Sequence, residues 1–294
     1  MFPMRSGLLI VNAFLNTTKY TEIYELLSEA ARRQNTALSV MSNGEFLLPC
    51  HDAPLSPNVS GYDFAIYWDK DLPLSRALEA AGLTLFNSSH AIALCDNKAL
   101  TLEALAGKIT LPKTYRIPLT FEAVGYTNND FLTLLEDTLG YPFIIKECCG
   151  SFGAQVYLVN SRSEALAALA RAHGRECIAQ EYIKESHGRD IRIHTVGNEV
   201  VTSMIRTNDN DFRANITNGG RMMPYTPTDE EAEMALNTAK LLGLDFAGVD
   251  ILFGKDGPIL CEVNSNAHFK NILKCTGVNV ADRILEHIKS VIYM

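Results

Sequence analysis

The segment FAGVDILFGKDGPILCEVN, residues 246–264, carries two acidic side chains and an amide within an otherwise apolar stretch. The central GKDGP has the composition of a tight turn, and the apolar, β-branched runs on either side of it predict a β-hairpin. If the turn centres on Asp256, Asp250 pairs directly with Glu262. Asn264 lies two residues beyond Glu262 and is therefore expected on the same face of the sheet.

This pairing predicts a metal site. Two carboxylates about 5 Å apart repel each other unless a cation lies between them. Two acids and an amide supply hard oxygen ligands, which suit magnesium and its bound phosphates, with manganese as the alternative ion. An edge hairpin with a solvated polar face is the other interpretation, but Glu262 and Asn264 interrupt an apolar strand where a core would require Ile or Leu. The same register pairs the opposite face, namely Val249 with Val263, Ile251 with Cys261 and Phe253 with Ile259.

A second candidate site lies in YPFIIKECCGSFGAQVYLV, residues 141–159, where a strand delivers Lys146 near its end. The loop Gly150–Gly153, which includes Ser151, then turns back into another strand. Glycines allow backbone N–H groups to close on an anion, and a nearby lysine adds a charge for phosphate oxygens. By itself such a loop is more typical of a plain hairpin. The interpretation of this loop as a phosphate site is supported by Lys98, at a helix start, and by the segment IAQEYIKESHGRDIRI.

The composition argues against several classes of protein. The chain has 294 residues and a net charge of −8 without any Lys/Arg-rich run, which argues against a nucleic-acid-binding protein. No apolar run approaches the roughly 18 residues of a membrane span. The start, MFPMRSGLLIVNAF, is typical of a first buried strand and not of a signal peptide. Seven cysteines without CxxC spacing predict reduced thiols and a cytoplasmic protein.

Hydrophobic periodicity divides the chain into three units. Residues 1–95 alternate strands and helices, a βαβ pattern that predicts a small parallel sheet with helices on its faces. The first strand leads into Asn12-Ala13-Phe14 instead of GxGxxG, so a dinucleotide-binding fold is not supported. Residues 96–177 and 178–294 predict two further units with largely antiparallel sheets, so the fold class is α/β followed by α+β. Helices are expected at residues 20–34, 72–81, 97–107, 130–139, 162–173, 229–242 and 279–292.

Six motifs follow one another along the chain in a fixed order. They are Asn97-Lys98, the strand with Lys146 and its Gly loop, Gln180–Glu185, Gly188–Arg192, Asn210–Asn215, and Ala247–Asp250 followed by Glu262–Asn264. Together they resemble the ATP-grasp ligases, and within them the RimK-type branch, the glutamate ligases that act on a ribosomal protein. The resemblance covers roughly residues 85–292, about two thirds of the chain, and the joint pattern is specific.

The resemblance implies an ATP-grasp fold preceded by an N-terminal βαβ domain, with ATP held between the two α+β units. It also implies a role for individual residues. The ATP contacts would be Lys98 and Lys146 on the phosphates, Ser151 and Gly153 in the Gly loop, Glu181, Tyr182 and Ile183 on the adenine edge, and Asp190 on the ribose. Arg213 and Asn215 would face the phosphates and the reacting acyl group, Arg206 would stabilise an acyl phosphate, and Asp250, Glu262 and Asn264 would hold magnesium.

One segment departs from the family pattern. Glutamate-loading members typically follow the Glu-x-Asn strand with Ser-Pro-Gly and a Glu-Gly turn, whereas this chain has Ser265–Asn271. His268 and Lys270 in this segment could bind a substrate carboxylate or take a proton from an attacking amine. A polar helix start with a solvated lysine is the alternative interpretation. We therefore expect glutamate to be a poor substrate or to bind through different contacts.

The residue types agree with one reaction class. Transfer of a γ-phosphoryl group to a carboxylate requires positioning and charge neutralisation, which lysines, arginines and magnesium provide, and no Ser-His-Asp or Cys-His arrangement is evident. We expect an ATP-dependent carboxylate–amine ligase that forms an amide through an acyl phosphate, adding an amino acid to a peptide, protein or small-molecule acceptor. A kinase-like ATP-grasp enzyme and a non-catalytic nucleotide-binding regulator are the alternatives. Family analogy also implies a homo-oligomer.

Overall fold

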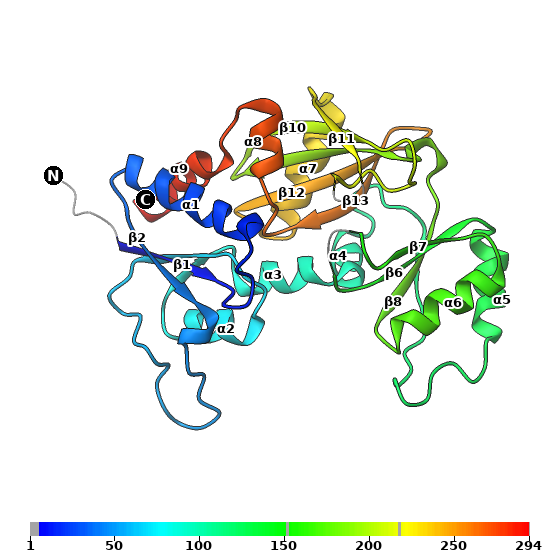
Figure 1. Cartoon of the computed structure of the whole chain (residues 1–294), viewed down its shortest axis with the longest axis horizontal. Coiled ribbons are helices and arrows are strands. Elements are labelled where there is room, and N and C mark those ends of the chain that lie inside the picture. The colour runs from blue at the N-terminus through cyan, green and yellow to red at the C-terminus, as the bar shows by residue number, and fades with distance from the viewer. Residues whose placement is uncertain (1–5, 151–152, 217–218, 294) are drawn as a thin grey trace.

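The structure, a computed structural model, describes residues 6–150, 153–216 and 219–293. Over these ranges the strands form three separate sheets, one for each part of the chain. In Figure 1 the N-terminal sheet lies at the lower left, the C-terminal sheet lies above it, and the central unit lies to the right. None of the helices in the described ranges is long and apolar enough to cross a membrane.

The N-terminal sheet is parallel, with the strand order β2-β1-β3-β4. Its central strand β1 alternates between two apolar cores. Leu9 and Val11 pack on the side of α1, whereas Leu8 and Ile10 pack on the side of α2, which explains the unbroken apolar run. The elements are β1 (Ser6–Val11), α1 (Thr18–Arg33), β2 (Ala37–Ser42), η1 (Asn43–Glu45), β3 (Phe64–Tyr67), α2 (Leu72–Ala80), β4 (Thr84–Phe86), α3 (Ser89–Asp96) and α4 (Lys98–Leu105). Within these elements the sequence prediction missed α3 and found α1, α2 and α4 to within two residues.

The central sheet is antiparallel, with the strand order β5-β8-β6-β7. Its strand β8 was expected in the third unit, because the prediction placed the boundary at residue 178. The pairing of β8 with β5 and β6 instead makes it part of the central sheet. The elements are β5 (Thr114–Arg116), α5 (Asp130–Leu139), β6 (Phe143–Glu147), β7 (Val156–Val159), α6 (Arg162–Ala172), β8 (Cys177–Glu181) and η2 (Lys184–Ser186).

The C-terminal sheet is also antiparallel, with the strand order β11-β10-β9-β12-β13. Helix α7 covers one face, where it packs on the apolar residues of β9 and β12. The opposite face carries polar residues that line the cavity described below, among them Asp190, Arg206 and Asp250. The elements are β9 (Arg189–Val196), β10 (Glu199–Thr207), β11 (Arg221–Pro224), α7 (Asp229–Leu241), β12 (Phe246–Phe253), β13 (Pro258–Asn264), α8 (Lys270–Thr276) and α9 (Val280–Ile292).

The register of the β12–β13 hairpin agrees with the prediction on one side of a bulge only. Asp250 pairs with Glu262 as expected, and Val249 pairs with Val263. Beyond Asp250 the register shifts by one residue, so the expected pairs of Ile251 with Cys261 and of Phe253 with Ile259 are wrong. The observed partners of Ile251 and Phe253 are Leu260 and Pro258. A bulge adds one residue to one strand and re-aims its side chains, so both Cys261 and Glu262 line the cavity described below.

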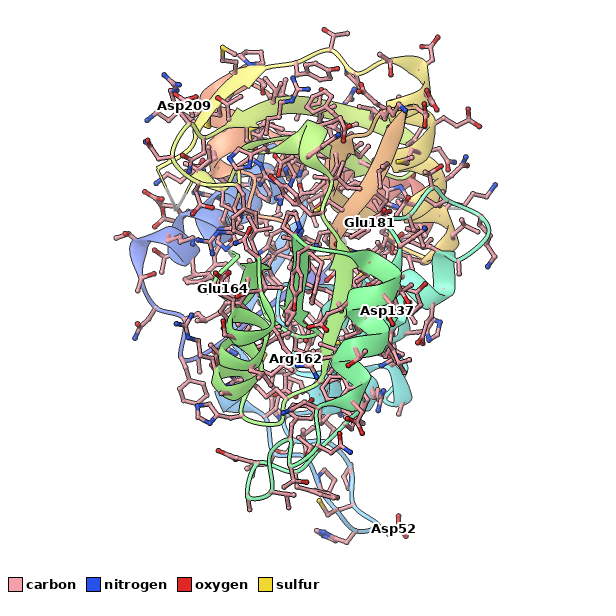
Figure 2. All side chains as sticks on the ribbon, turned by 90° about the vertical axis from the view of Figure 1, so that its right-hand side faces the viewer. Asp52, Asp137, Arg162, Glu164, Glu181 and Asp209 are labelled. Carbon is pink, nitrogen blue, oxygen red and sulfur yellow. The ribbon has the colours of Figure 1, made fainter. Side chains whose placement is uncertain are left out.

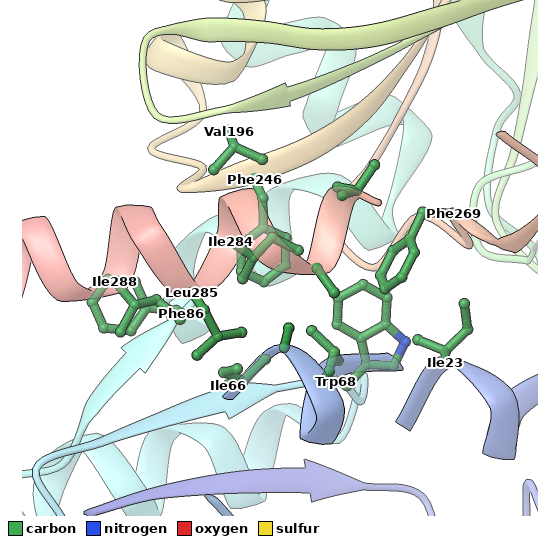
Figure 3. Close-up of a cluster of buried hydrophobic side chains, with 14 of the residues drawn as sticks. Ile23, Ile66, Trp68, Phe86, Val196, Phe246, Phe269, Ile284, Leu285 and Ile288 are labelled. Carbon is green, nitrogen blue, oxygen red and sulfur yellow. The ribbon is translucent and has the colours of Figure 1, made fainter. Parts of the chain in front are cut away.

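One aromatic core joins the N-terminal unit to the C-terminal sheet (Figure 3). Trp68, just after β3, stacks on Phe246 with ring centroids 5.7 Å apart and meets the edge of Phe269 at 5.6 Å. Apolar residues of α1 and α9 complete this cluster. At its rim, Arg33 of α1 forms an ion pair with Asp282 of α9 at 2.5 Å. The two units therefore share a hydrophobic core instead of meeting at a solvated interface.

Phe269 tests this shared core because its side chain is completely buried. We expect Phe269→Ala to lower the free energy of unfolding by about 3–5 kcal/mol, the cost of a large cavity in a core. Urea-induced unfolding followed by circular dichroism would measure the change. Leu134→Ala, at an exposed position on α5, is the control and should change the free energy by about 0.5 kcal/mol or less. An equally small effect of Phe269→Ala would contradict the shared core.

Candidate nucleotide and metal site

A cavity of about 760 Å³, counted to its open mouth, lies between the central and C-terminal sheets. In Figure 2, Glu181 marks the level at which the green central unit meets the yellow and orange C-terminal sheet. Twelve of the residues singled out from the sequence line this cavity: Lys98, Lys146, Gly153, Glu181, Tyr182, Ile183, Asp190, Arg206, Arg213, Asn215, Asp250 and Glu262. Asn264, His268 and Lys270 do not line it, and Ser151 lies outside the described residues.

Two lysines reach the cavity from different elements of the chain. Lys146, on β6, donates from Nζ to the side-chain oxygen of Gln180 at 2.6 Å, within a buried environment. Lys98, at the start of α4, donates from Nζ to the carbonyl of Gly150 at 3.1 Å. The side chain of Asn97 caps α4 by accepting hydrogen bonds from the backbone N–H groups of Ala99 and Leu100. This cap fixes the start of the helix and therefore the position of Lys98. Both ammonium groups thus reach the same cavity, where they can meet an anion, and that of Lys98 contacts the Gly loop.

The end of β8 forms another wall of the cavity. The Glu181 carboxylate accepts a hydrogen bond through Oε1 from the backbone N–H of Lys113 at 2.6 Å. This bond and the backbone bond from Glu181 to Lys113, at 2.9 Å, hold the end of the strand in place. The following residues, Tyr182 and Ile183, line the cavity with it. Backbone groups at such a strand end are available to an adenine edge.

The irregular segment 208–216 lines the cavity with Phe212–Asn215 and contacts the Gly loop at Gly153. Arg213 donates from Nη1 to the carbonyl of Gly153 at 2.6 Å and is oriented by two bonds to Asp211, at 3.0 and 2.7 Å. A side chain on Gly153 would lie 3.1 Å from Oδ1 of Asn215, and the φ of Gly153 is +70°. Glycine is therefore required where the two loops meet. A polar segment that lines the cavity and contacts Gly153 in this way is typical of a lid.

Four charged side chains form a network across the polar face of the C-terminal sheet. Strand pairing sets Arg206 opposite Asp190 and Arg192 opposite Asp250. Arg206 donates from Nε and Nη2 to the two oxygens of Asp190, both at 2.7 Å, and its Nη2 lies 3.0 Å from Oδ2 of Asp250. Arg192 donates from Nη2 to Oδ2 of Asp250 at 2.6 Å, and its Nε bonds to Oδ1. Burial alone would raise the pKa of Asp250, but the two guanidinium groups hold it at about 2.

This network revises two expectations from the sequence. The charge of Asp250 is balanced by two arginines in this structure, so a metal ion is not the only cation that can offset its repulsion from Glu262. Both oxygens of Asp190 accept hydrogen bonds from Arg206. A ribose that contacts Asp190, as predicted, would therefore bind a carboxylate that already forms an ion pair. Arg192 was not singled out, although it follows Asp190 by two residues and therefore shares its face of β9.

The residues present fit a magnesium ion. Glu262 lies opposite Asp250, and Asn264 lies two residues further along the same strand. Among the described residues neither Glu262 nor Asn264 has a side-chain hydrogen-bond partner, so the oxygens of both are available. No group of three His, Cys, Asp or Glu side chains is gathered as a metal cluster in the described ranges, and the expected set contains only two carboxylates. Carboxylate and amide oxygens are the donors that magnesium prefers.

The segment after β13 runs close over β12 toward the N-terminal unit. A side chain on Gly248 would lie 2.4 Å from Cβ of Ala267, so only glycine allows this crossing. The ring of His268 meets the edge of Tyr20, on α1, at 5.0 Å. Burial, and then the charges of Lys19 and Arg192, lower the pKa of His268 to about 4. The imidazole is therefore neutral at pH 7.

Lys270 is the first residue of α8, and its Nζ forms an ion pair with Glu22 on α1. This pair ties α8 to the N-terminal unit at a partly exposed position. Lys270 therefore lies where the alternative interpretation of the segment 265–271 placed it, at the polar start of a helix. A role of His268 or Lys270 toward the substrate stays a prediction.

Residues 95–288 match the model of the RimK-like ATP-grasp domain. The chain belongs to this family. A curated relative from Mycoplasma pneumoniae, the "Uncharacterized protein MG012 homolog", is 30% identical over 285 residues, which cover 94% of this chain and 96% of the relative. The "Probable alpha-L-glutamate ligase" of Citrobacter koseri is 35% identical over 218 residues, which cover 73% of this chain and 70% of the ligase.

A solved structure extends the likeness to the whole RimK-like chain. The ATP-grasp ligase PsnB, complexed with a phosphomimetic variant of its minimal precursor, Mg and ADP, has a TM-score of 0.71 at 16% identity. The alignment covers 99% of this chain and 100% of PsnB, and it shows that the fold is the same.

These matches confirm that the chain is a RimK-type protein with an ATP-grasp fold. They also confirm the reaction class, ATP-dependent formation of a carbon–nitrogen bond, because the relatives with a named activity are ligases. Neither a kinase-like enzyme nor a non-catalytic regulator receives support. The roles of individual residues stay predictions.

His194 of the RimK-like sheet lies two residues beyond Arg192 on the same face of β9. It is 2% exposed, and its Nε2 has no hydrogen-bond partner among the described residues. Burial, and then the charge of Arg192, lower the pKa of His194 to about 3. The ring is therefore neutral in the folded protein across the physiological range.

This shift predicts a pH-dependent stability. As the pH falls, the unfolded chain takes up a proton near the ordinary pKa of 6.5, whereas the folded protein resists protonation down to about 3. The free energy of unfolding should therefore decrease as the pH falls through this window. His194→Gln should flatten the decrease between pH 6.5 and about 4.5, as measured by urea unfolding at each pH. The exposed His90→Gln is the control, and equal slopes in His194→Gln and wild type would refute the assignment.

Proposed function

We propose that this protein is an ATP-dependent carboxylate–amine ligase that forms an amide bond through an acyl phosphate. One observation carries the proposal: basic and acidic side chains from the central unit, the C-terminal sheet and the segment around Arg213 line a single cavity. Among them are the basic residues Lys98, Lys146, Arg206 and Arg213 and the carboxylates Asp250 and Glu262. Belonging to the RimK-like ATP-grasp family supports ATP and magnesium as the cofactors.

The proposed reaction has two balanced steps. An oxygen of the substrate carboxylate attacks the γ-phosphorus of ATP, and the bond to the leaving ADP breaks. The amine then attacks the acyl carbon of this mixed anhydride, phosphate departs, and the amine loses a proton. No protein nucleophile is required, so the chain contributes positioning and charge neutralisation.

Individual residues would divide this work. Lys98 and Lys146 would hold the phosphates beside the Gly loop, and Arg213 would close the lid over them. Arg206 would face the charge that develops on the transferred phosphoryl group. Magnesium, when held by Asp250, Glu262 and Asn264, would neutralise the phosphate oxygens. Manganese ions could take the same oxygen donors.

The substrate class is an amino acid joined to a peptide, protein or small-molecule acceptor. The name of the Citrobacter koseri relative supports glutamate as the amino acid, whereas the divergent segment 265–271 supports contacts unlike those of glutamate-loading members. All seven cysteines are free thiols, which supports a cytoplasmic location. A homo-oligomeric state stays an expectation from the family.

The reaction route is testable with trapped intermediates. ATP should be split to ADP and phosphate only when a carboxylate substrate is present, since the carboxylate is the phosphoryl acceptor. Hydroxylamine added in place of the amine should yield a hydroxamate. Mass spectrometry of reactions with pools of amino acids and peptides would identify both products and substrates. Formation of AMP and pyrophosphate would refute this route and indicate an adenylating enzyme.

The phosphate site is testable by removing one charge. Lys146→Ala should weaken ATP binding by about 1.5–3 kcal/mol, the range for one charge-assisted hydrogen bond. Isothermal titration calorimetry would measure the affinity. Lys108→Ala, at an exposed residue outside the cavity, is the matched control. Unchanged affinity in Lys146→Ala would show that this ammonium does not contact the nucleotide.

A further inference from the structure

The carboxylate of Asp250 is held by two guanidinium groups. Its Oδ2 accepts from Arg192 at 2.6 Å and lies 3.0 Å from Nη2 of Arg206, while its Oδ1 accepts from Arg192. Asp250 is 4% exposed, so water screens these charges only weakly. Two arginines and the two aspartates of the network cancel one another in charge. With Glu262 opposite Asp250, a bare divalent cation therefore meets one net negative charge at this position instead of the two that these carboxylates would present without the arginines.

A metal ion at Asp250 would also lie close to positive charge. Magnesium binds carboxylate oxygens at about 2.0–2.1 Å, and both oxygens of Asp250 already contact an arginine nitrogen. The ion would be repelled by both guanidinium groups unless additional negative charge arrived with it. Nucleotide phosphates are such a charge, and the cavity that would hold them reaches both Asp250 and Arg206.

The two arginines differ in their access to those phosphates. Arg206 lines the cavity and keeps a second partner, Asp190, on two bonds of 2.7 Å. Arg192 does not line the cavity, and among the described residues its only ion-pair partner is Asp250. Its side chain runs instead beside Gly248, where an added Cβ would lie 3.3 Å from Cδ of Arg192. Of the two, Arg192 is the residue that binding of a metal ion must displace.

We propose that Arg192 is a positioning residue that holds Asp250 in the nucleotide-free protein and makes metal binding conditional on the nucleotide. The inference rests on the proposed function, because it assigns Asp250 to the metal site of the ligase. Without nucleotide, Arg192 competes with the divalent cation for the carboxylate. With nucleotide, the phosphates compensate the positive charge, and Asp250 exchanges Arg192 for the metal. The two ligands then bind with positive coupling, for which about 5–150-fold is typical.

The experiment measures binding of Mn²⁺, which prefers the same oxygen donors as magnesium, by the electron paramagnetic resonance signal of the free ion. Nucleotide-free wild-type protein should bind Mn²⁺ at least about 10-fold more weakly than Arg192→Gln does, because that variant gives the cluster a net negative charge. Arg192→Lys keeps the charge and should resemble the wild type. Arg221→Gln, which removes an exposed arginine paired with Asp209, is the control and should show no gain.

Two further measurements separate the possible failures. Adding Glu262→Gln to Arg192→Gln should abolish the gained binding if the ion sits at the proposed site. Wild-type protein with adenylyl imidodiphosphate should retain more Mn²⁺ than the nucleotide alone, and absence of this ternary complex would count against the proposed metal site itself. If nucleotide-free wild-type protein binds Mn²⁺ through Glu262 as tightly as Arg192→Gln does, the proposed role of Arg192 is wrong. If the variant fails to fold, the wild-type protein is measured with and without adenylyl imidodiphosphate, and equally tight Mn²⁺ binding by the protein in both states would refute the proposed role of Arg192.

Discussion

The pairing of β9 with β12 is the constraint on which the candidate site depends. It sets Arg192 opposite Asp250 and, through the next strand on the other side of β9, brings Arg206 to the same carboxylate. No single strand contains enough charge to build this cluster. Each arginine and aspartate is tolerable in the buried sheet because its neighbour on the adjacent strand compensates it. The cluster therefore forms only when these strands pair, and the proposed metal and phosphate chemistry depends on the cluster.

The C-terminal sheet also contacts both of the other units. Its polar end faces the cavity shared with the central unit, and its apolar end, at Phe246 and Val196, enters the core formed with the N-terminal unit. The segment that follows β13 passes between these two environments and is anchored at both ends. Phe269 is buried in the core, whereas Asn264 is the last residue of β13 and pairs with Gly248. This segment therefore belongs to the packing of two units at once.

Local patterns in the sequence were sufficient for part of this arrangement. Alternation along β12 and β13 placed Asp250 opposite Glu262, because that pairing is set by a short turn. The contact between Arg192 and Asp250 joins strands that are 58 residues apart, and hydrophobic periodicity does not specify which distant strands pair. The bulge at Cys261 escaped prediction for a related reason, since one extra residue leaves the apolar pattern almost unchanged. Strand β8 was placed in the wrong sheet because its partners precede it in the chain.

The packing of α1 against α9 has a consequence for how the protein is made. Arg33 and Asp282 are 249 positions apart, so the first helix emerges from the ribosome long before its partner exists. Until then the apolar face of α1, with Ile23 and Leu27, packs only against its own sheet and lacks the cover of α9. The N-terminal unit cannot complete its own core during synthesis, and contacts of such long range form late and slowly. A chain that stopped before residue 280 would keep its cavity residues but expose the core of its first unit to chaperones and proteases.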